Sequence, residues 1–200
     1  MIQKFGKEYV VNDDTYHMGI HQALGEHVAT RFEECKVVLD ACAGAGFMSL
    51  ALARHVSKVI AVDINAEHLA QARENARIEE RVEQIEFVEG DVLKVLPGIP
   101  FLDGAFLDPD WARPGDKKTI HVSALENMEP SATRLYMEVA EKTKNICLRL
   151  PKTFNSEELK KLPACEFEAV YLNDDLKFYC AYWGKLVKKE GNTEIRIHWL

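Results

Sequence analysis

The segment VVLDACAGAG, residues 37–46, constrains the fold of this chain more than any other feature. It predicts a short apolar strand that ends near Asp40, followed by a loop with two glycines that opens a helix. Glycines at such a turn let the backbone bend sharply and approach a ligand closely. This unit is typical of α/β proteins that bind a ligand beyond the carboxyl end of a strand.

The rest of the chain continues the alternation of strands and helices. Further strands are predicted at residues 58–64, 85–88, 101–107, 145–150, 165–172 and 177–187, with an edge strand at 193–200. Helices are predicted at residues 18–33, after Gly46, after Asn65, at 131–143 and at 157–162. The pattern indicates an α/β fold: a mainly parallel sheet that ends in a hairpin and carries helices on both faces.

The glycine loop alone leaves two kinds of ligand open. A dinucleotide motif would have a third glycine, but Ser49 stands at that position. Asp40 discriminates between the ligands, because a carboxylate at the strand end repels a pyrophosphate. The same carboxylate attracts the ammonium or sulfonium charge of S-adenosylmethionine. Asp40 therefore favours S-adenosylmethionine over a dinucleotide.

Two more carboxylates follow the next strands. Asp63 ends the second strand, where it can accept both hydroxyls of a ribose, and Asp91 follows the third, where it can reach an adenine amino group. Each Asp taken alone is more simply a turn or helix-cap residue. Three successive strand ends that carry an acceptor, together with the glycine pair, favour a site for S-adenosylmethionine.

These residues resemble the class I S-adenosylmethionine-dependent methyltransferases. The matching segments are VVLDACAGAG (37–46), VIAVDI (59–64) and EGDV (89–92). The resemblance covers residues 35–187 and implies a Rossmann-like seven-stranded sheet with an antiparallel last strand. It implies cofactor contacts at Asp40, Gly44, Gly46, Asp63 and Asp91, and we assign the adjoining Ala41, Ile64 and Val92 to the same predicted site.

The sequence Asp108-Pro109-Asp110-Trp111 follows the fourth predicted strand. It resembles the [DNS]-P-P-[YFW] motif of methyltransferases that act on exocyclic amines. The lone pair of an aromatic amine is delocalised into the ring, so acceptors that hold its N–H groups can localise the lone pair and aim it. We expect the Asp108 carboxylate and the Pro109 carbonyl to do this, and Trp111 to stack on the base. The alternative is a turn with Trp111 packed in the core.

Within that class, the chain looks most like the RNA cap guanine-N2 methyltransferases, the trimethylguanosine synthase family. The residues that carry this resemblance are LDACAGAGFMSLALA (39–53), AVDINAEHLAQARENA (61–76), IEFVEGDV (85–92) and FLDPDW (106–111). Residues 16–29 also resemble the helix that precedes the cofactor domain in that family. The resemblance implies methylation of a guanine N2 amine in RNA, a domain at 35–200, and a segment at 1–34 whose helix packs over the site.

The motif departs from the family pattern at Asp110, which replaces the second Pro. Asp110 is either an extra acceptor or a change of geometry, and it could favour a cationic base such as 7-methylguanine on Trp111. The chain also lacks the long N-terminal extension of eukaryotic members, which predicts a bare catalytic domain whose substrate can be an RNA other than a cap.

The composition of the chain limits the partners, the compartment and the metals that we expect for it. The net charge of −7 argues against a broad electrostatic grip on duplex nucleic acid. Five Cys without a CxxC pair, and no signal peptide or membrane span, predict a cytoplasmic protein. His17 and His21 have i, i+4 spacing but lack the Glu of HExxH and a third ligand, so we expect no metal.

Three other functions remain open at this stage. The acceptor could be another amine, on a small molecule, a protein, adenine or cytosine. The chain could be a non-catalytic module that binds a nucleotide or RNA in the same pocket. A nicotinamide dehydrogenase is disfavoured by Asp40 and Ser49. The sequence does not indicate an oligomeric state.

Overall fold

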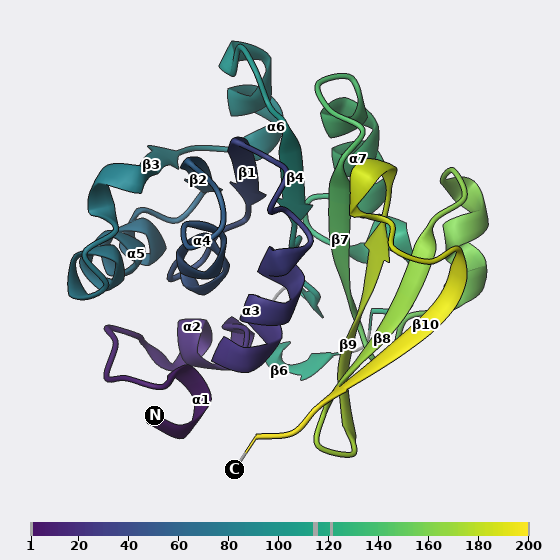
Figure 1. Cartoon of the computed structure of the whole chain (residues 1–200), viewed down its shortest axis with the longest axis horizontal. Coiled ribbons are helices and arrows are strands. Elements are labelled where there is room, and N and C mark those ends of the chain that lie inside the picture. Colours follow the sequence, from purple (N-terminus) through teal and green to yellow (C-terminus); the bar gives the residue numbers. More distant parts are fainter. Residues whose placement is uncertain (1, 114–115, 121, 200) are drawn as a thin grey trace. The chain divides into compact units, whose positions relative to one another are not determined.

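The computed structural model describes residues 2–113, 116–120 and 122–199. The chain divides into two compact units, Met1–Gly104 and Ala105–Leu200. Figure 1 shows their elements, coloured along the sequence.

The first unit contains a three-stranded parallel arrangement flanked by helices. Its elements are the helices α1 (Ile2–Phe5), α2 (Asp13–Met18), α3 (Gln22–Thr30), α4 (Phe47–Leu52), α5 (Ala66–Ile78) and α6 (Val92–Val95), the 3-10 turns Val82–Gln84 and Leu96–Gly98, and the strands β1 (Val37–Ala41), β2 (Lys58–Asp63) and β3 (Ile85–Glu89). The strand β2 lies between β1 and β3 and is parallel to both. The carboxyl ends of these strands therefore meet at one edge, as the sequence predicted.

The helix α5 has a side-chain cap at its N-terminus and a buried apolar face. The Asn65 side chain caps it by accepting from the backbone N–H groups of Glu67 and His68. The residues at helical spacing, Leu69 and Ala72, are buried against the strands, as is Ala76 one turn further on. The helix predicted after Asn65 is therefore confirmed.

The N-terminal region differs from the single helix predicted at residues 18–33. The structure places α3 within that range and a separate helix, α2, before it, because α2 begins after the Asn12 capping box and ends at Met18, where the extended ψ of 137° at Gly19 stops the helix. The helix α3 then has its own cap, since His21 Nδ1 accepts from the backbone N–H of Ala23 at 3.2 Å. Local capping has overridden the apolar periodicity on which the prediction relied.

The described residues of the second unit contain five strands of the main sheet, a separate pair of short strands and one α-helix. Its elements are the strands β4 (Gly104–Leu107), β5 (Ala112–Arg113), β6 (Asp116–Ile120), β7 (Ile146–Pro151), β8 (Glu166–Leu172), β9 (Asp175–Tyr182) and β10 (Gly191–Ile197), the helix α7 (Ala132–Ala140), and the 3-10 turns Leu125–Asn127, Ser156–Lys161 and Gly184–Leu186. The short strands β5 and β6 form a separate antiparallel pair. The other five are ordered β4, β7, β9, β8 and β10.

The strand β9 is antiparallel to both of its neighbours, β7 and β8, and forms the expected hairpin with β8. The strands β4 and β7 are parallel. Among the described residues, the main strands number three in the first unit and five in the second, which is one more than the seven that the family resemblance implies. The additional strand is β10, which pairs in parallel with β8 near the predicted edge strand at 193–200.

A buried carboxylate explains why β10 forms. Glu166, at the start of β8, accepts hydrogen bonds from the backbone N–H of Lys188, at 2.7 Å, and from Thr193 Oγ1, at 3.0 Å. These bonds fix the turn that leads into β10 beside β8.

Candidate functional site

The glycine loop joins β1 to α4 and contains three residues with positive φ, namely Cys42, Gly44 and Gly46. A Cβ atom on Gly46 would lie 2.8 Å from the Cβ atom of Ala72, so the absence of a side chain lets the loop pack against α5. A Cβ atom on Gly44 would meet nothing within 4 Å. The loop therefore turns one glycine toward a helix and the other toward open space.

Asp40 lies within β1, and its exposed fraction is 0%. Its Oδ2 atom accepts a hydrogen bond of 2.5 Å from Ser49 Oγ on α4. Ser49 is the residue that replaces the third glycine of a dinucleotide motif, so its hydroxyl supports the carboxylate that distinguishes the two ligands. From the sequence, Ser49 was interpreted only as the residue that stands in place of the third glycine. Its place one helical turn after the loop was the signal that could have suggested a supporting role.

Asp63 connects the end of β2 to the glycine loop. Its Oδ2 atom accepts from the backbone N–H of Gly44 at 2.8 Å, and its Oδ1 atom accepts from the backbone N–H of Asn65 at 2.9 Å. Burial opposes ionisation of this carboxyl, but hydrogen bonds from His68, Asn65 and Gly44 hold its pKa below the usual range. The next residue, Ile64, has 74% of its surface exposed. The structure thus places a charged acceptor and an exposed apolar side chain beside the loop.

Asp91 follows β3 and caps α6, since its Oδ1 atom accepts from the backbone N–H of Leu93 at 3.0 Å. The backbone N–H of Gly90 donates to the Asp63 carbonyl at 2.9 Å, which ties the ends of β2 and β3 together. Val92 is buried as the first residue of α6. Asp91 therefore has the cap role that the sequence left open, and its contact with an adenine stays a prediction.

The second group of predicted residues follows β4. Pro109 is buried, and Asp110 is exposed. The backbone of Asp110 is held by an isolated antiparallel bridge to Glu129, with N–H···O distances of 2.8 and 3.1 Å. Asp108, which directly follows the strand, is mostly buried. This bridge fixes the backbone of the segment that carries the Asp108 and Trp111 side chains.

Arg149 of β7 joins two of these residues. Its Nη1 atom lies 2.5 Å from Asp108 Oδ2, and its guanidinium carbon lies 4.4 Å from the centroid of the Trp111 ring. Burial raises the pKa of the Asp108 carboxyl, and Arg149 opposes that rise. Arg149 was not among the predicted site residues, although a single charge inside the apolar run Ile146–Leu150 was a visible signal.

His21, one of the two histidines with i, i+4 spacing, has a structural contact in α3. His21 Nδ1 is an acceptor in the cap of α3. Among residues 2–113, 116–120 and 122–199, no group of three or more His, Cys, Asp or Glu side chains is arranged to hold a metal ion. No helix in the described part of the chain has the length and apolar character that crossing a bilayer requires.

Solved structures of methyltransferases share this fold. A candidate methyltransferase from Porphyromonas gingivalis W83 superposes with a TM-score of 0.72 at 21% identity, over 88% of this chain and 43% of that protein. An O-methyltransferase from Bacillus cereus, solved in complex with SAH, has a TM-score of 0.57 at 12% identity, over 88% of this chain and 92% of its own. The fold is therefore the Rossmann-like fold of methyltransferases, as expected.

Comparison by sequence is more specific. The family model for RNA cap guanine-N2 methyltransferases matches residues 35–186, and the chain belongs to this family. Membership confirms the expected class, the S-adenosylmethionine-dependent methyltransferases, and the expected cofactor, S-adenosylmethionine.

A curated relative, an uncharacterised RNA methyltransferase of Synechocystis sp., is 34% identical over 97 residues. The match covers 45% of this chain and 21% of that relative. The chain thus spans about a fifth of this relative and less than half of the Porphyromonas protein.

Proposed function

We propose that this protein transfers a methyl group from S-adenosylmethionine to the exocyclic N2 amine of a guanine in RNA. The observation that carries the proposal is Asp108, a carboxylate at the carboxyl end of β4 that is followed by Pro109 and Trp111, in a chain of the RNA cap guanine-N2 methyltransferase family. The name of the Synechocystis relative supports RNA as the substrate class.

The first unit supplies the proposed cofactor site. The open space beside Gly44 fits a ligand that approaches the loop backbone, and the ionised Asp63 fits the two hydroxyls of a ribose. Asp40 would contribute negative potential toward the cationic methionine part, and the exposed Ile64 an apolar surface for the adenine. Gly46, Ala41, Asp91 and Val92 complete this proposed site.

The second unit supplies the proposed amine site. S-adenosylmethionine, when bound, supplies a methyl group on a sulfonium, and the C–S electron pair departs with the neutral thioether. The Asp108 carboxylate and the Pro109 carbonyl would accept the two N–H groups of the amine and direct its lone pair. The nitrogen gains a positive charge as its new C–N bond forms, and Asp108 is an acceptor for the proton it then releases.

The segment at residues 1–34 is part of the proposal, as a cover over the cofactor loop. Asn75 of α5 carries the connection, since its Nδ2 atom donates to the carbonyl of Ala45 in the loop and to the carbonyl of Val10, both at 3.0 Å. Thr15 Oγ1 also donates to Gln71 Oε1 at 2.7 Å. One buried amide therefore bridges the loop and the N-terminal segment.

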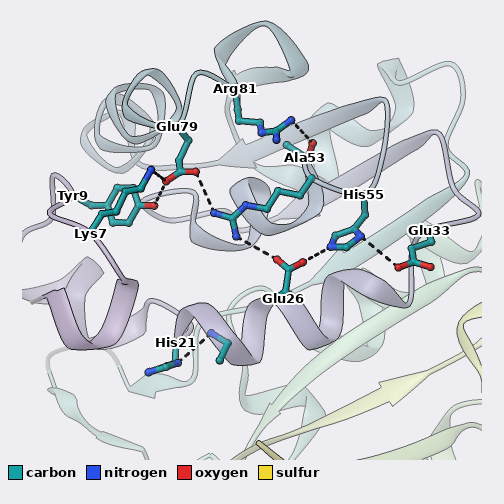
Figure 2. A network of polar contacts seen from close by, with 11 residues as sticks. Lys7, Tyr9, His21, Glu26, Glu33, Ala53, His55, Glu79 and Arg81 are labelled. Carbon is teal, nitrogen blue, oxygen red and sulfur yellow. Dashed lines mark hydrogen bonds and ion pairs between the residues drawn. The ribbon is translucent and has the colours of Figure 1, made fainter. Parts of the chain in front are cut away.

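A charged network fastens the same segment. Figure 2 shows Lys7 and Tyr9 pointing toward Glu79, and Glu26 pointing toward His55. Glu79 lies 2.9 Å from Lys7 Nζ and accepts a 2.5 Å hydrogen bond from the Tyr9 hydroxyl. Arg54 lies 3.2 Å from both Glu79 and Glu26, which links α5 to α3.

Amide hydrogen exchange tests the proposed cover. With S-adenosylmethionine added, the amides of residues 8–18 are expected to exchange more slowly, because a ligand on the loop stabilises everything bridged to it through Asn75. The β8–β9 hairpin serves as the internal control and is expected to exchange as before. Unchanged exchange at residues 8–18, with cofactor demonstrably bound, would contradict the cover.

Mass-spectrometric nucleoside analysis tests the proposed reaction. RNA incubated with the protein and S-adenosylmethionine carrying a deuterated methyl group is expected to yield labelled N2-methylguanosine. Asp108→Ala, with cofactor binding checked by calorimetry, is the matched control and is expected to lose the label. Label that appears only in protein or metabolites, or on another base, would reject the guanine substrate and identify the alternative amine.

Calorimetry in which NAD binds more tightly than S-adenosylmethionine would reject the cofactor site.

A cytoplasmic location is also proposed. All five cysteines are free thiols, which is the state maintained in a reducing compartment. Fluorescence microscopy of the tagged protein, or fractionation, checks it.

A further inference from the structure

Arg149 is a largely buried cation within β7, two residues before that strand ends, with an exposed fraction of 8%. Its position follows from strand register. The strands β4 and β7 pair in parallel, with Leu107 opposite Leu148, so the next residue on each strand is Asp108 on one and Arg149 on the other. The pairing itself brings the guanidinium to the first residue of the motif.

Asp108, Trp111 and Phe178 contact this guanidinium. Asp108 accepts from its Nη1 atom, and the rings of Trp111 and Phe178 lie 4.4 and 4.9 Å from its central carbon. The position of Phe178 also follows from register, because β9 runs antiparallel to β7 with Phe178 opposite Pro151. A planar guanidinium can accept this environment, since it forms a hydrogen bond at its edge while aromatic rings contact its faces.

We propose that Arg149 is a positioning residue of the methyl-transfer site, which keeps the Asp108 carboxylate in its acceptor form and fixes the plane of the Trp111 ring. The inference rests on the proposed function for its chemistry. A protonated carboxyl has an O–H to donate and a weaker acceptor, so it holds an amine N–H poorly. Arg149 supplies the positive charge that preserves the acceptor form at a site where burial disfavours it.

The charged groups near Asp108 determine the direction in which its pKa shifts. Asp110 is the other carboxylate whose charge acts on Asp108, and it raises the Asp108 pKa, as burial does, while Arg149 lowers it. Phe178 and Trp111, whose rings lie beside the guanidinium, do not titrate. Removing Arg149 therefore leaves two influences that raise the Asp108 pKa, with no described cation opposing them.

The first test is the pH profile of methyl transfer under single-turnover conditions. In Arg149→Gln, the acid limb of the profile is expected to move up by about one pH unit or more, because an adjacent opposite charge lowers an Asp pKa by about that amount. Arg149→Lys keeps the charge but loses the planar group, so its acid limb is expected to stay near that of the wild type while its rate falls.

Arg196→Gln is the matched control. Arg196 also lies over an aromatic ring, 4.1 Å from the centroid of Tyr171, and near a carboxylate, 3.6 Å from Asp174, but it belongs to β10 and not to the motif. Its variant is expected to keep the wild-type pH profile. A shift of equal size in both variants would overturn the proposal, since it would reflect a general change of charge or stability.

A second measurement is independent of the substrate. Carboxyl ¹³C NMR titration, with the Asp108 resonance assigned by its loss in Asp108→Asn, reports the Asp108 pKa in the wild type and in Arg149→Gln. A higher pKa in the variant is expected. An unchanged pKa, with the fold intact by circular dichroism, would overturn the role of Arg149 whatever the acceptor is. If the titration behaves as expected but no guanine is methylated, the proposed function fails while the Arg149–Asp108 coupling stands.

Discussion

Gly44 and Gly46 lie two residues apart in the glycine loop, and both have positive φ, at 54° and 81°. They differ in what surrounds them. Ala72 blocks a side chain at Gly46, while the space beside Gly44 is open. One position is therefore constrained by packing, and the other is available to a ligand. The two alanine substitutions should separate these roles.

Gly46→Ala is expected to destabilise the fold by about 2 kcal/mol or more, because it adds a close contact with Ala72 to the strain of a left-handed residue. Gly44→Ala is expected to destabilise the fold only by the strain of an Ala in the left-handed region, about 1 kcal/mol. Its larger effect should be on cofactor affinity, lowered about tenfold, or about 1.4 kcal/mol, by a methyl group in the proposed site. Urea unfolding and calorimetry measure the two effects. Equal destabilisation with unchanged affinity in Gly44→Ala would contradict the open face of the loop.

Ser49 allows a second prediction at this scale. Ser49→Ala removes the hydroxyl that donates to the buried Asp40 carboxylate, and the loss is expected to cost about 1–3 kcal/mol of unfolding free energy. Ser49→Thr retains the hydroxyl and is expected to retain more stability than Ser49→Ala. Chemical denaturation of both variants provides the comparison, and an Ala variant as stable as the wild type would show that the hydroxyl does not support Asp40.

The elements show how far local sequence signals reach. The strands β1 and β2, the glycine loop and the helix α5 follow from residues within a few positions of each other, so they could be predicted from the sequence. The helix predicted from residue 18 begins instead at Gln22, because the extended Gly19 and the cap at His21 outweigh an apolar period. Arg149 was missed for another reason. Its contact with Asp108 spans 41 residues and depends on the register of β4 against β7, which no local pattern encodes.

The charged network between the N-terminal segment, α3 and α5 also joins distant residues, and it gives a pH prediction. Burial works against ionisation of Glu79, but hydrogen bonds from Tyr9, Lys7 and Arg54 lower its pKa to about 2. A carboxyl with a lowered pKa stabilises the folded state above its unfolded value near 4.5, and this contribution disappears as the pH falls toward 2.

Glu79→Gln is expected to lower stability by about 1–3 kcal/mol at pH 7, because it removes a charge that accepts several hydrogen bonds. The gap between wild type and variant should narrow as the pH falls from about 4.5 to about 2. Glu74→Gln in α5 is the control, since Glu74 is exposed and pairs with Arg77 in a surface ion pair. Urea unfolding over this pH range measures the gap, and a constant gap would contradict the role of the Glu79 charge.

Across the whole molecule, charge is distributed unevenly between the two units. Residues 1–104 contain ten Lys and Arg against seventeen Asp and Glu, whereas residues 105–200 contain fifteen of each. The entire net charge of −7 therefore falls on the unit with the proposed cofactor site. That unit repels RNA phosphates and attracts a cationic cofactor, while the neutral unit carries the proposed amine site.

This distribution predicts how an RNA substrate would bind. Each phosphate neutralised in a single strand contributes about −0.7 to the slope of log K against log salt. With no net positive unit to follow the backbone, we expect fewer than about three such contacts and a slope shallower than about −2. Affinity should then depend mainly on the base held at Asp108 and Trp111. Fluorescence anisotropy of a labelled guanine-containing oligonucleotide, repeated from low to high salt, gives the slope. A slope steeper than about −4 would mean that the backbone dominates binding, and that base recognition at Asp108 and Trp111 is the minor contribution.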